Sequence, residues 1–576
     1  MLSHLIPRLR RLRATATLGA VFGVLAALLA GPLAAPAAAD SYTPISGAGS
    51  TWAENAVAEW RRAVNQYGMR ISYAGNGSSD GRRQFLSGTV DFAVSDIPFQ
   101  THPTDGSAAE RPGAGSYAYM PIVAGGTVFM YHLTVNGKRV NNLRLSGDVV
   151  TKIFTGAVKS WDDPVIKADN PGVQLPHRTI VPVVRSDGSG STAQFTMWMA
   201  DQHKSLWQAY CRKVGRAKAC GQTSNYPTPK KTNMIAQSGD LGVAGYVSQN
   251  YGEGAIGYVN YSYALNAHYP VAKVLNHAGY YTEPTARNVA VSLLKAKINT
   301  NKSSADYLTQ QLNGVYTDSD KRNYPLSSYS YMILPLKVQG TFTKAKGKTL
   351  GAFSYYFMCQ GQQRAPQLGY SPLPINLVKA GFDQIRRIPG VQTKNVNLKG
   401  CNNPTFSADG HNKLAETAPY PKACDKQGAA PCTSGSGGAK SNGTNGGSGG
   451  TSGGSASGGA ASGGASGGSD GGTTGAGGTT GGAQPSVDPD TGQTLSPGGN
   501  ASGGSGGGAS VDDTIALAQP VTVAAEHGWT STQTLMLLAA FLVLGLVLLP
   551  SLVSRLITGT RGADGRDDRV ADGGSR

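Results

Sequence analysis

The chain has 576 residues, of which 51 are lysine or arginine and 34 are aspartate or glutamate, so its net charge at neutral pH is +17. Such a basic balance is typical of proteins that bind anions, nucleic acid or acidic surfaces. The sequence contains no CxxC, HExxH or similar ligand spacing, which argues against a zinc site.

Residues 1–39 have the organisation of an export signal. Four arginines between residues 8 and 13 precede an apolar run at residues 20–30, and Ala37–Ala39 offer a cleavage site of small residues. An uncleaved membrane anchor is the alternative, but the apolar run is short for a span. The first cysteine is Cys211, so the cleavage point lacks the cysteine that would carry a lipid. The mature chain is expected to begin near Asp40, outside the cytoplasm, which argues against nucleic acid as a partner.

The folded body is expected to cover residues 40–432, where short apolar strands alternate with amphipathic helices. Strands are predicted to end at Ile45 and to cover residues 71–74, 90–94, 119–123, 128–135, 179–184 and 255–259. Helices are predicted from a cap at Thr51 to Val64 and at residues 80–86, 147–154 and 191–200, with weaker patterns for helices near 285–297 and 303–314 and a strand at 331–336. This alternation predicts an α/β fold with parallel sheets and with ligand groups at the carboxyl ends of strands. A body of this length exceeds one ordinary core, so two lobes are expected.

Three segments rich in glycine and serine each end a predicted strand and begin a predicted helix. They are GAGSTW at residues 47–52, GNGSSDG at residues 75–81 and RSDGSGS at residues 185–191. A helix N-terminus carries unpaired backbone N–H groups and the positive end of the helix dipole, and both attract anions. Three converging helix starts would surround a small oxyanion with donors. The body is therefore predicted to bind an anion, in agreement with its basic charge.

Six cysteines in an exported body predict three disulfides. Cys211 and Cys220 flank a short basic loop and are expected to pair. The other four are Cys359, Cys401, Cys424 and Cys432. They allow three pairings, and joining the first two and the last two is one of them.

The composition of the C-terminal part predicts a tether that links the body to the membrane. Residues 433–510 contain 31 glycines among 78 positions and no aromatic residue, which predicts a disordered linker. After a juxtamembrane segment at residues 511–533, residues 534–553 form an uncharged apolar run long enough to span a bilayer. The first charges of the following tail, residues 554–576, are arginines, which favours a cytoplasmic tail. A single-pass anchor with the body outside is therefore predicted, with a buried core helix as the alternative.

The motifs of the body resemble those of the phosphate-binding proteins of ABC transporters, the PstS type. GAGSTW, YAGNGSSDGRRQF, TVDFAVSDIP, the WDD at residues 161–163 and VRSDGSGST occur in the order seen in that family. The resemblance covers roughly residues 43–265 and fades through the rest of the body. It implies a two-lobed periplasmic-binding-protein fold, type II-like, that closes on one phosphate and delivers it to a membrane permease.

The resemblance also implies where the lobes divide. Lobe I would comprise about residues 40–130 plus 262–426, and lobe II about residues 131–261. Binding would close the lobes around a hinge of crossing strands near residues 130–135 and 256–262.

Carried over position by position, the family's phosphate contacts fall on Thr51, Trp52, Ser78, Asp96, Arg185, Ser189, Gly190 and Ser191. Ser50 and Asp187 are secondary candidates. Trp52 stands where the family commonly has phenylalanine, but that contact is made by a backbone N–H. Ser191 replaces the usual threonine and keeps a hydroxyl.

The chemistry of these side chains supports the same ligand without the family. Arg185 offers a planar fork of donors suited to a tetrahedral oxyanion, and Asp187 is expected to orient it. Asp96 is unusual beside an anion, because an ionised carboxylate can only accept a hydrogen bond. Phosphate at neutral pH keeps a proton and sulfate has none, so Asp96 is predicted to reject sulfate.

Several motifs also have a structural interpretation. Residues 75–81 match a dinucleotide fingerprint poorly and are more typical of a tight turn before a helix, which Asp80 can cap. Trp161-Asp162-Asp163 is more typical of a turn than of a catalytic carboxylate pair. Ser189 lies between glycines, but the GxSxG spacing and a paired histidine are missing, which argues against a serine hydrolase.

We therefore expect a monomeric phosphate receptor, held at the extracytoplasmic face of the membrane, that feeds an ABC permease and its ATPase. No metal, no cofactor, no nucleic-acid partner and no enzymatic activity are expected. A surface adhesin or sensor that keeps an anion-binding fold is the first alternative. An exported phosphatase is the second, although it would normally show a metal cluster or an activated nucleophile.

Overall fold

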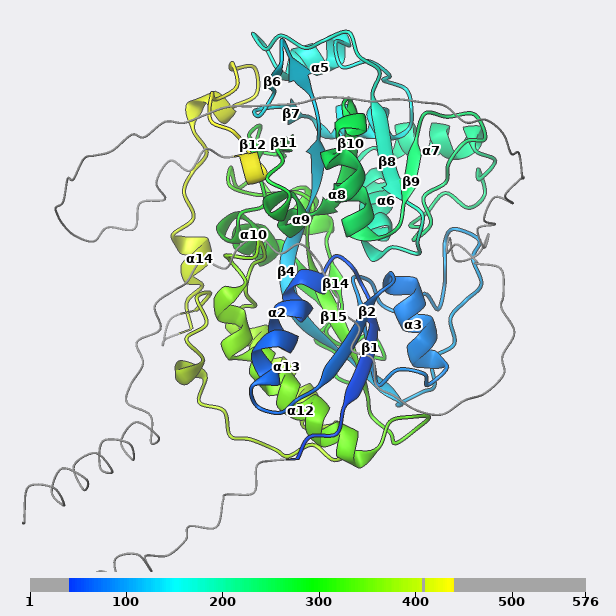
Figure 1. Cartoon of the computed structure of the whole chain (residues 1–576), viewed down its shortest axis with the longest axis vertical. Helices are drawn as coiled ribbons and strands as arrows, with labels where there is room; N and C mark the ends of the chain where they lie inside the picture. The colour runs from blue at the N-terminus through cyan, green and yellow to red at the C-terminus, as the bar shows by residue number, and fades with distance from the viewer. Residues whose placement is uncertain (1–40, 407–409, 440–576) are drawn as a thin grey trace, which may run out of the picture. The chain divides into compact units, whose positions relative to one another are not determined.

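The computed structural model describes residues 41–406 and 410–439 (Figure 1). By internal contacts the chain divides into two units, Met1–Pro497 and Gly498–Arg576, and every described residue belongs to the first. The predicted signal, membrane span and tail, the juxtamembrane segment and the linker beyond residue 439 lie outside the described residues. None of the helices in the described part is long and apolar enough to cross a membrane.

The first lobe is built on a mixed sheet with the strand order β2-β1-β3-β15-β4. Its strands are β1 (Ile45–Gly49), β2 (Ile71–Gly75), β3 (Phe92–Ser95), β15 (Ser327–Pro335) and the first part of β4 (Tyr117–Tyr131). β1 pairs in parallel with β2 and β3, whereas β15 is antiparallel to both of its neighbours. The helices that pack on these strands are α2 (Glu54–Asn65), α3 (Ser78–Leu86), α12 (Lys344–Met358) and α13 (Ile375–Ile385).

The second lobe continues the same path in the order β4-β10-β8-β9. Its strands are β8 (Val181–Arg185), β9 (Ile235–Gln237), β10 (Ala255–Asn260) and β11 (Val271–Leu275), with the short β7 (Arg144–Leu145) and β12 (Tyr281–Thr282) beside β11. Its helices are α4 (Gly147–Phe154), α5 (Pro164–Asp169), α6 (Gly190–Gln202), α7 (Lys204–Lys213), α8 (Gly239–Ser248) and α9 (Tyr261–Asn266). The remaining short elements are β5 (Thr134–Val135), β6 (Lys138–Arg139), β13 (Lys297–Ile298), β14 (Gln310–Gln311), α10 (Ala286–Ser292), α11 (Asn313–Tyr316) and α14 (Lys413–Glu416).

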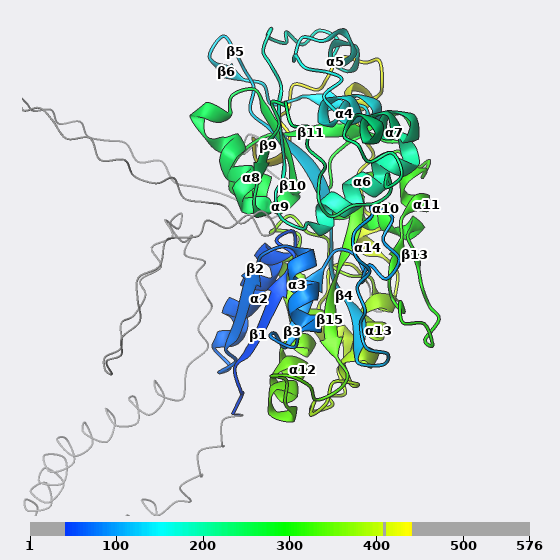
Figure 2. The ribbon, with the colours of Figure 1, turned by 90° about the vertical axis from the view of Figure 1, so that its right-hand side faces the viewer.

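The long strand β4 runs through both lobes, which lie one above the other in Figure 2. Its pairing partner changes from β15 at Gly126 to β10 at Thr127. A side chain at Gly126 would overlap Pro284, and a Cβ at Gly125 would lie 2.8 Å from the indole of Trp52. The glycines therefore let both lobes pack tightly where the strand crosses. The strand predicted at residues 119–123 and the first part of that predicted at 128–135 form one strand, because these glycines do not interrupt it. β4 ends at Tyr131, and residues 134–135 belong to the separate strand β5.

The α/β alternation in two lobes is confirmed, and the helix predicted at residues 147–154 is α4. The sheet is mixed rather than parallel, because β4 and β15 run against their neighbours. The helix predicted at residues 303–314 is wrong. There Asn301 accepts a hydrogen bond from the backbone of Ser303, Ser304 accepts one from Asp306, and Leu308 has a φ of 71°. These local side-chain bonds compete with the helix, so residues 302–308 form turns, followed by the short β14 and α11.

Three disulfides close loops in the described residues, and they join Cys211 to Cys220, Cys359 to Cys401 and Cys424 to Cys432. The expected first pair is thus present. The other two follow one of the three pairings that the sequence left open.

Candidate functional site

Four helix N-termini meet between the two lobes. α2 and α3 belong to the first lobe, and α6 and α8 to the second. The first lobe's Ser79 donates its backbone N–H to the carbonyl of Gly188 at 2.9 Å, directly across the interface. A Cβ at Gly190 would lie 2.5 Å from both the Ser78 hydroxyl and a carboxylate oxygen of Asp96. Two of the predicted loops, from different lobes, are therefore in direct contact.

Backbone donors remain unpaired at this meeting point. Within residues 41–406 and 410–439, no hydrogen-bond acceptor is found for the N–H groups of Thr51, Trp52, Ser78, Gly190 and Ser191. Such orphan groups are expected in the first turn of a helix, where they attract an anion. Ser78 and Gly190 are the first residues of α3 and α6. The arrangement is therefore a set of N–H donors presented by both lobes.

Arg185 is fully buried at the end of β8 and is held by carboxylates on two sides. Its Nε donates to Asp187 at 2.7 Å and its Nη1 lies 2.5 Å from Asp240. Nη1 also donates to the Ser191 hydroxyl at 3.2 Å, and Nη2 to the Thr51 hydroxyl at 2.8 Å. Burial by itself lowers the pKa of Arg185, but the two carboxylates raise it above its ordinary value. The guanidinium is a fixed positive charge, oriented by Asp187 as the sequence predicts.

Asp240, in the first turn of α8, links the two lobes and was missed by sequence reasoning. Its side chain is fully buried and accepts the Thr51 hydroxyl at 2.6 Å, while its own backbone N–H donates to that hydroxyl at 3.1 Å. Its second oxygen accepts the N–H of Asn260 at 2.6 Å. The prediction that Thr51 caps α2 is therefore wrong. Its hydroxyl is used in the contact with Asp240, and α2 starts at Glu54 without a side-chain cap.

Asp96 lies on the opposite side of the site, after β3, in a ring of hydroxyl donors. Ser50 donates to it at 2.7 Å, Ser330 at 2.9 Å and Ser78 at 3.2 Å. Burial raises the pKa of this carboxyl to about 6, although the bonds from Ser50 and Ser330 act in the opposite direction. Asp96 is thus a buried acceptor whose charge is costly to keep at neutral pH.

Trp52 is placed by the crossing strand. Its indole N–H donates to the Thr127 hydroxyl at 3.1 Å, and its backbone carbonyl accepts the Tyr370 hydroxyl at 2.6 Å. The indole fits because Gly125 lacks a side chain there. The larger ring at this position is therefore accommodated in the core with its backbone N–H left free.

The structure brings together all of the predicted site residues, namely Ser50, Thr51, Trp52, Ser78, Asp96, Arg185, Asp187, Ser189, Gly190 and Ser191.

Asp163 caps α5 and accepts the N–H of Val165 at 3.0 Å, so the WDD motif is a structural turn. Asp80 does not cap α3 but bonds to side chains, including that of Asn76. One signal for Asp240 was present, because Ser238-Gly239-Asp240 is another Gly/Ser-containing helix start.

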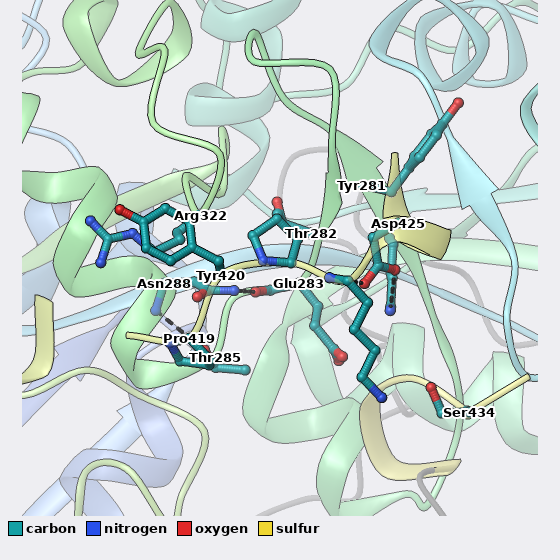
Figure 3. Close-up of a pocket in the computed structure, with 14 residues that line it drawn as sticks. Tyr281, Thr282, Glu283, Thr285, Asn288, Arg322, Pro419, Tyr420, Asp425 and Ser434 are labelled. Carbon is teal, nitrogen blue, oxygen red and sulfur yellow. Dashed lines mark hydrogen bonds and ion pairs between the residues drawn. The ribbon is translucent and has the colours of Figure 1, made fainter. Parts of the chain in front are cut away.

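A separate cavity of about 380 Å³ lies beneath the C-terminal segment at residues 419–435 (Figure 3). Lys273 in its wall pairs with Asp425 at 2.7 Å. Arg322 pairs with Asp320 at 2.7 Å and stacks on the ring of Tyr420. These wall charges are neutralised locally, in contrast to the donors between the lobes. In the residues that the structure describes, no group of three or more His, Cys, Asp or Glu could hold a metal ion.

Comparison with known proteins gives a consistent family. A PBP superfamily domain profile matches residues 34–360. The chain is 32% identical over 338 residues to a phosphate-binding protein PstS of Xylella fastidiosa, covering 58% of this chain and 83% of that protein. It is 29% identical over 358 residues to one of Methanocaldococcus jannaschii, covering 60% and 86%. Phosphate-binding protein PstS 2 of Mycobacterium tuberculosis is 28% identical over 338 residues, covering 57% and 83%.

Solved structures with a similar chain include PfluDING, a high-affinity periplasmic phosphate-binding protein, bound with phosphate. Its TM-score is 0.45 at 18% identity, covering 62% of this chain and all of that one. A phosphate-binding protein from Stenotrophomonas maltophilia has a TM-score of 0.44 at 18% identity, covering 64% and 99%.

Proposed function

The chain belongs to the PBP superfamily and, within it, to the family of phosphate-binding proteins named PstS, and on this premise we propose that it captures inorganic phosphate. In the proposal, phosphate binds between the lobes and is passed to an ABC permease without chemical change. The receptor acts outside the cytoplasm as a monomer, held by the C-terminal anchor that the sequence predicts at residues 534–553.

The observation that carries the proposal is the convergence of unpaired N–H groups beside a buried arginine. Five such groups, from Thr51, Trp52, Ser78, Gly190 and Ser191, point to an acceptor-rich ligand of small size. Arg185 adds a cation whose orientation is fixed by Asp187. A tetrahedral oxyanion offers acceptors in all directions, so it can use donors from both lobes at once.

In the proposal, Asp96 makes the site select phosphate over sulfate. Three hydroxyls already donate to the carboxylate of Asp96. It can accept a further hydrogen bond only from a ligand that carries a proton. Phosphate meets this requirement and sulfate does not. Sulfate would instead bring an unprotonated oxygen against a buried carboxylate, which is an unfavourable contact.

The test is calorimetric titration of the full chain in detergent, after bound phosphate has been stripped, first with phosphate and then with sulfate at pH 8. One-to-one binding of phosphate without a sulfate response is expected. The absence of binding heat with both anions would contradict the proposal and would favour the adhesin or sensor alternative.

Replacing Thr51 with valine is expected to weaken phosphate binding by about tenfold or more. Valine has the shape of threonine but no hydroxyl, so Arg185 and Asp240 would each lose a buried partner, at a cost of about 1–3 kcal/mol. Thr51→Ser, which keeps the hydroxyl, is the matched control and should bind almost as tightly as the unaltered chain. Equal affinities of the two variants in the titration would show that the hydroxyl contact between the lobes is not used.

A further inference from the structure

A second cavity, of about 300 Å³, lies on the first lobe and shares no residue with the site between the lobes. Its wall comes from α2, from the turn at Gln360–Arg364 after α12, and from the loop around Gly400 and Asn402. Helices α2 and α12 pack together in this lobe (Figure 1). The cavity is thus built from segments far apart in the sequence.

Two tyrosines form an aromatic corner in this cavity. The rings of Tyr67 and Tyr356 have their centroids 6.4 Å apart and are inclined by 53°. Tyr67 is 52% exposed, so part of its ring is open to solvent. Behind them the buried Trp60 stacks on Phe357 at 4.8 Å. The corner therefore has a rigid apolar support and open ring surface.

The rest of the wall is made of planar polar groups. The carboxylate of Glu59, only 15% exposed, accepts from Arg62 at 2.9 Å and from Arg364 at 3.0 Å. Arg364, which lines the cavity, is 75% exposed and keeps further donors free for a ligand. The amide side chains in the wall are Gln360, Gln363 and Asn402. Amides both donate and accept, which suits partners that do the same.

A disulfide and a hydrogen bond hold the segment Gln360–Arg364 and the loop around Asn402 together. The disulfide between Cys359 and Cys401 joins the residue before Gln360 to the residue before Asn402. Gln363 also donates to the Cys401 carbonyl at 2.8 Å. Asn402 has a φ of 48°, in the left-handed region that few residues other than glycine adopt. The cavity is therefore fixed before any ligand arrives, which reduces the entropic cost of binding.

We propose that this cavity binds one pyranose unit of a carbohydrate. A sugar ring has C–H faces, which pack on aromatic rings, and hydroxyls around its edge, which donate and accept at the same time. The aromatic corner and the amide and carboxylate wall supply these two kinds of contact. The polar lining disfavours a purely apolar ligand. A volume of about 300 Å³ is at the small end of ligand sites and suits a single ring.

The test is saturation-transfer NMR on the full chain in a detergent without sugar, with D-glucose, D-galactose, D-mannose and N-acetyl-D-glucosamine as separate probes. Transfer to the ring protons of at least one probe is expected at millimolar concentration. Tyr67→Ala should weaken that binding by about tenfold, because the open ring face is lost. Beads carrying the same sugar by a linker distinguish a free monosaccharide from the end of a glycan, since only a site that accepts glycan ends retains the chain on them.

Tyr420→Ala is the matched control, since Tyr420 is an exposed tyrosine outside this cavity. It should bind the sugar like the unaltered chain, and Gln360→Ala should weaken binding without affecting folding. No transfer to any probe would overturn the proposal, as would equal transfer with Tyr67→Ala or equal loss with Tyr420→Ala. Phosphate titrations of the same samples are expected to be unchanged, so failure here is separate from failure of the proposed phosphate function.

Discussion

Arg185→Lys is expected to weaken phosphate binding by about a hundredfold or more, with the fold retained. The guanidinium donates in four directions at once, to Asp187, Asp240, Ser191 and Thr51. Lysine keeps the charge but has a compact ammonium group that cannot serve these partners together. At least one buried carboxylate then loses its partner, at a cost of about 2–5 kcal/mol in binding. Calorimetric titration with phosphate measures the loss directly.

Arg322→Lys is the matched control for this variant. Arg322 is also paired with an aspartate two residues away, Asp320, but it lies outside the site between the lobes. Its replacement should leave phosphate affinity unchanged, and thermal unfolding without phosphate should report the cost of each substitution to the fold. Near-normal affinity of Arg185→Lys, or an equal loss with Arg322→Lys, would remove Arg185 from the proposed site.

The parts of this site that the sequence predicted are those encoded locally. Each loop is a short run in which glycine permits a sharp turn, as at Gly77 with its φ of 98°, and the following residues begin a helix. Parallel strands then bring the loop ends to one edge of the sheet. The Arg185–Asp187 pair is likewise separated by two residues. Such features can be predicted because the physical cause lies within a few residues.

The contacts that the sequence did not predict join residues far apart in the chain. Thr51 bonds to Asp240 across 189 positions and Asp96 to Ser330 across 234. Ser330 lies beside Asp96 because β15 pairs with β3, and Asp240 reaches Thr51 because α8 packs on β10, which pairs with β4. No spacing rule reports such pairings, so Ser330 could not be distinguished from an ordinary core residue, and the helix start at Ser238–Asp240 did not indicate that Asp240 bonds to Thr51. The same holds for the direction of β15, which makes the sheet mixed.

Burial of Asp96 has a consequence for stability that depends on pH. Its pKa rises from an ordinary 3.8 to about 6 in the folded chain, so the folded state holds a proton that the unfolded state releases between these values. The contribution of Asp96 to stability therefore falls as pH rises through this window and is constant above about pH 6. The penalty at pH 8 is about 3 kcal/mol. Asp96→Asn should remove it and raise the free energy of unfolding at pH 8, but not below pH 4.

The same titration predicts that sulfate affinity increases as the pH falls. At pH 8 about one chain in a hundred carries a proton on Asp96, given a pKa of about 6. A protonated Asp96 can donate to an unprotonated oxygen, so sulfate becomes acceptable to the site. We expect sulfate affinity to rise by about a hundredfold from pH 8 to pH 5 and to level off below pH 6. Phosphate, which carries a proton throughout this range, should change much less.

Asp96→Asn separates this effect from the general influence of pH on a basic protein. Its amide can donate at every pH, so the variant should bind sulfate with an affinity that does not depend on pH between 5 and 8. A pH-independent sulfate response in the unaltered chain, together with full rejection of sulfate by Asp96→Asn, would mean that another group excludes sulfate. The expected pattern instead ties anion selectivity to one buried carboxyl, whose pKa is raised by its burial.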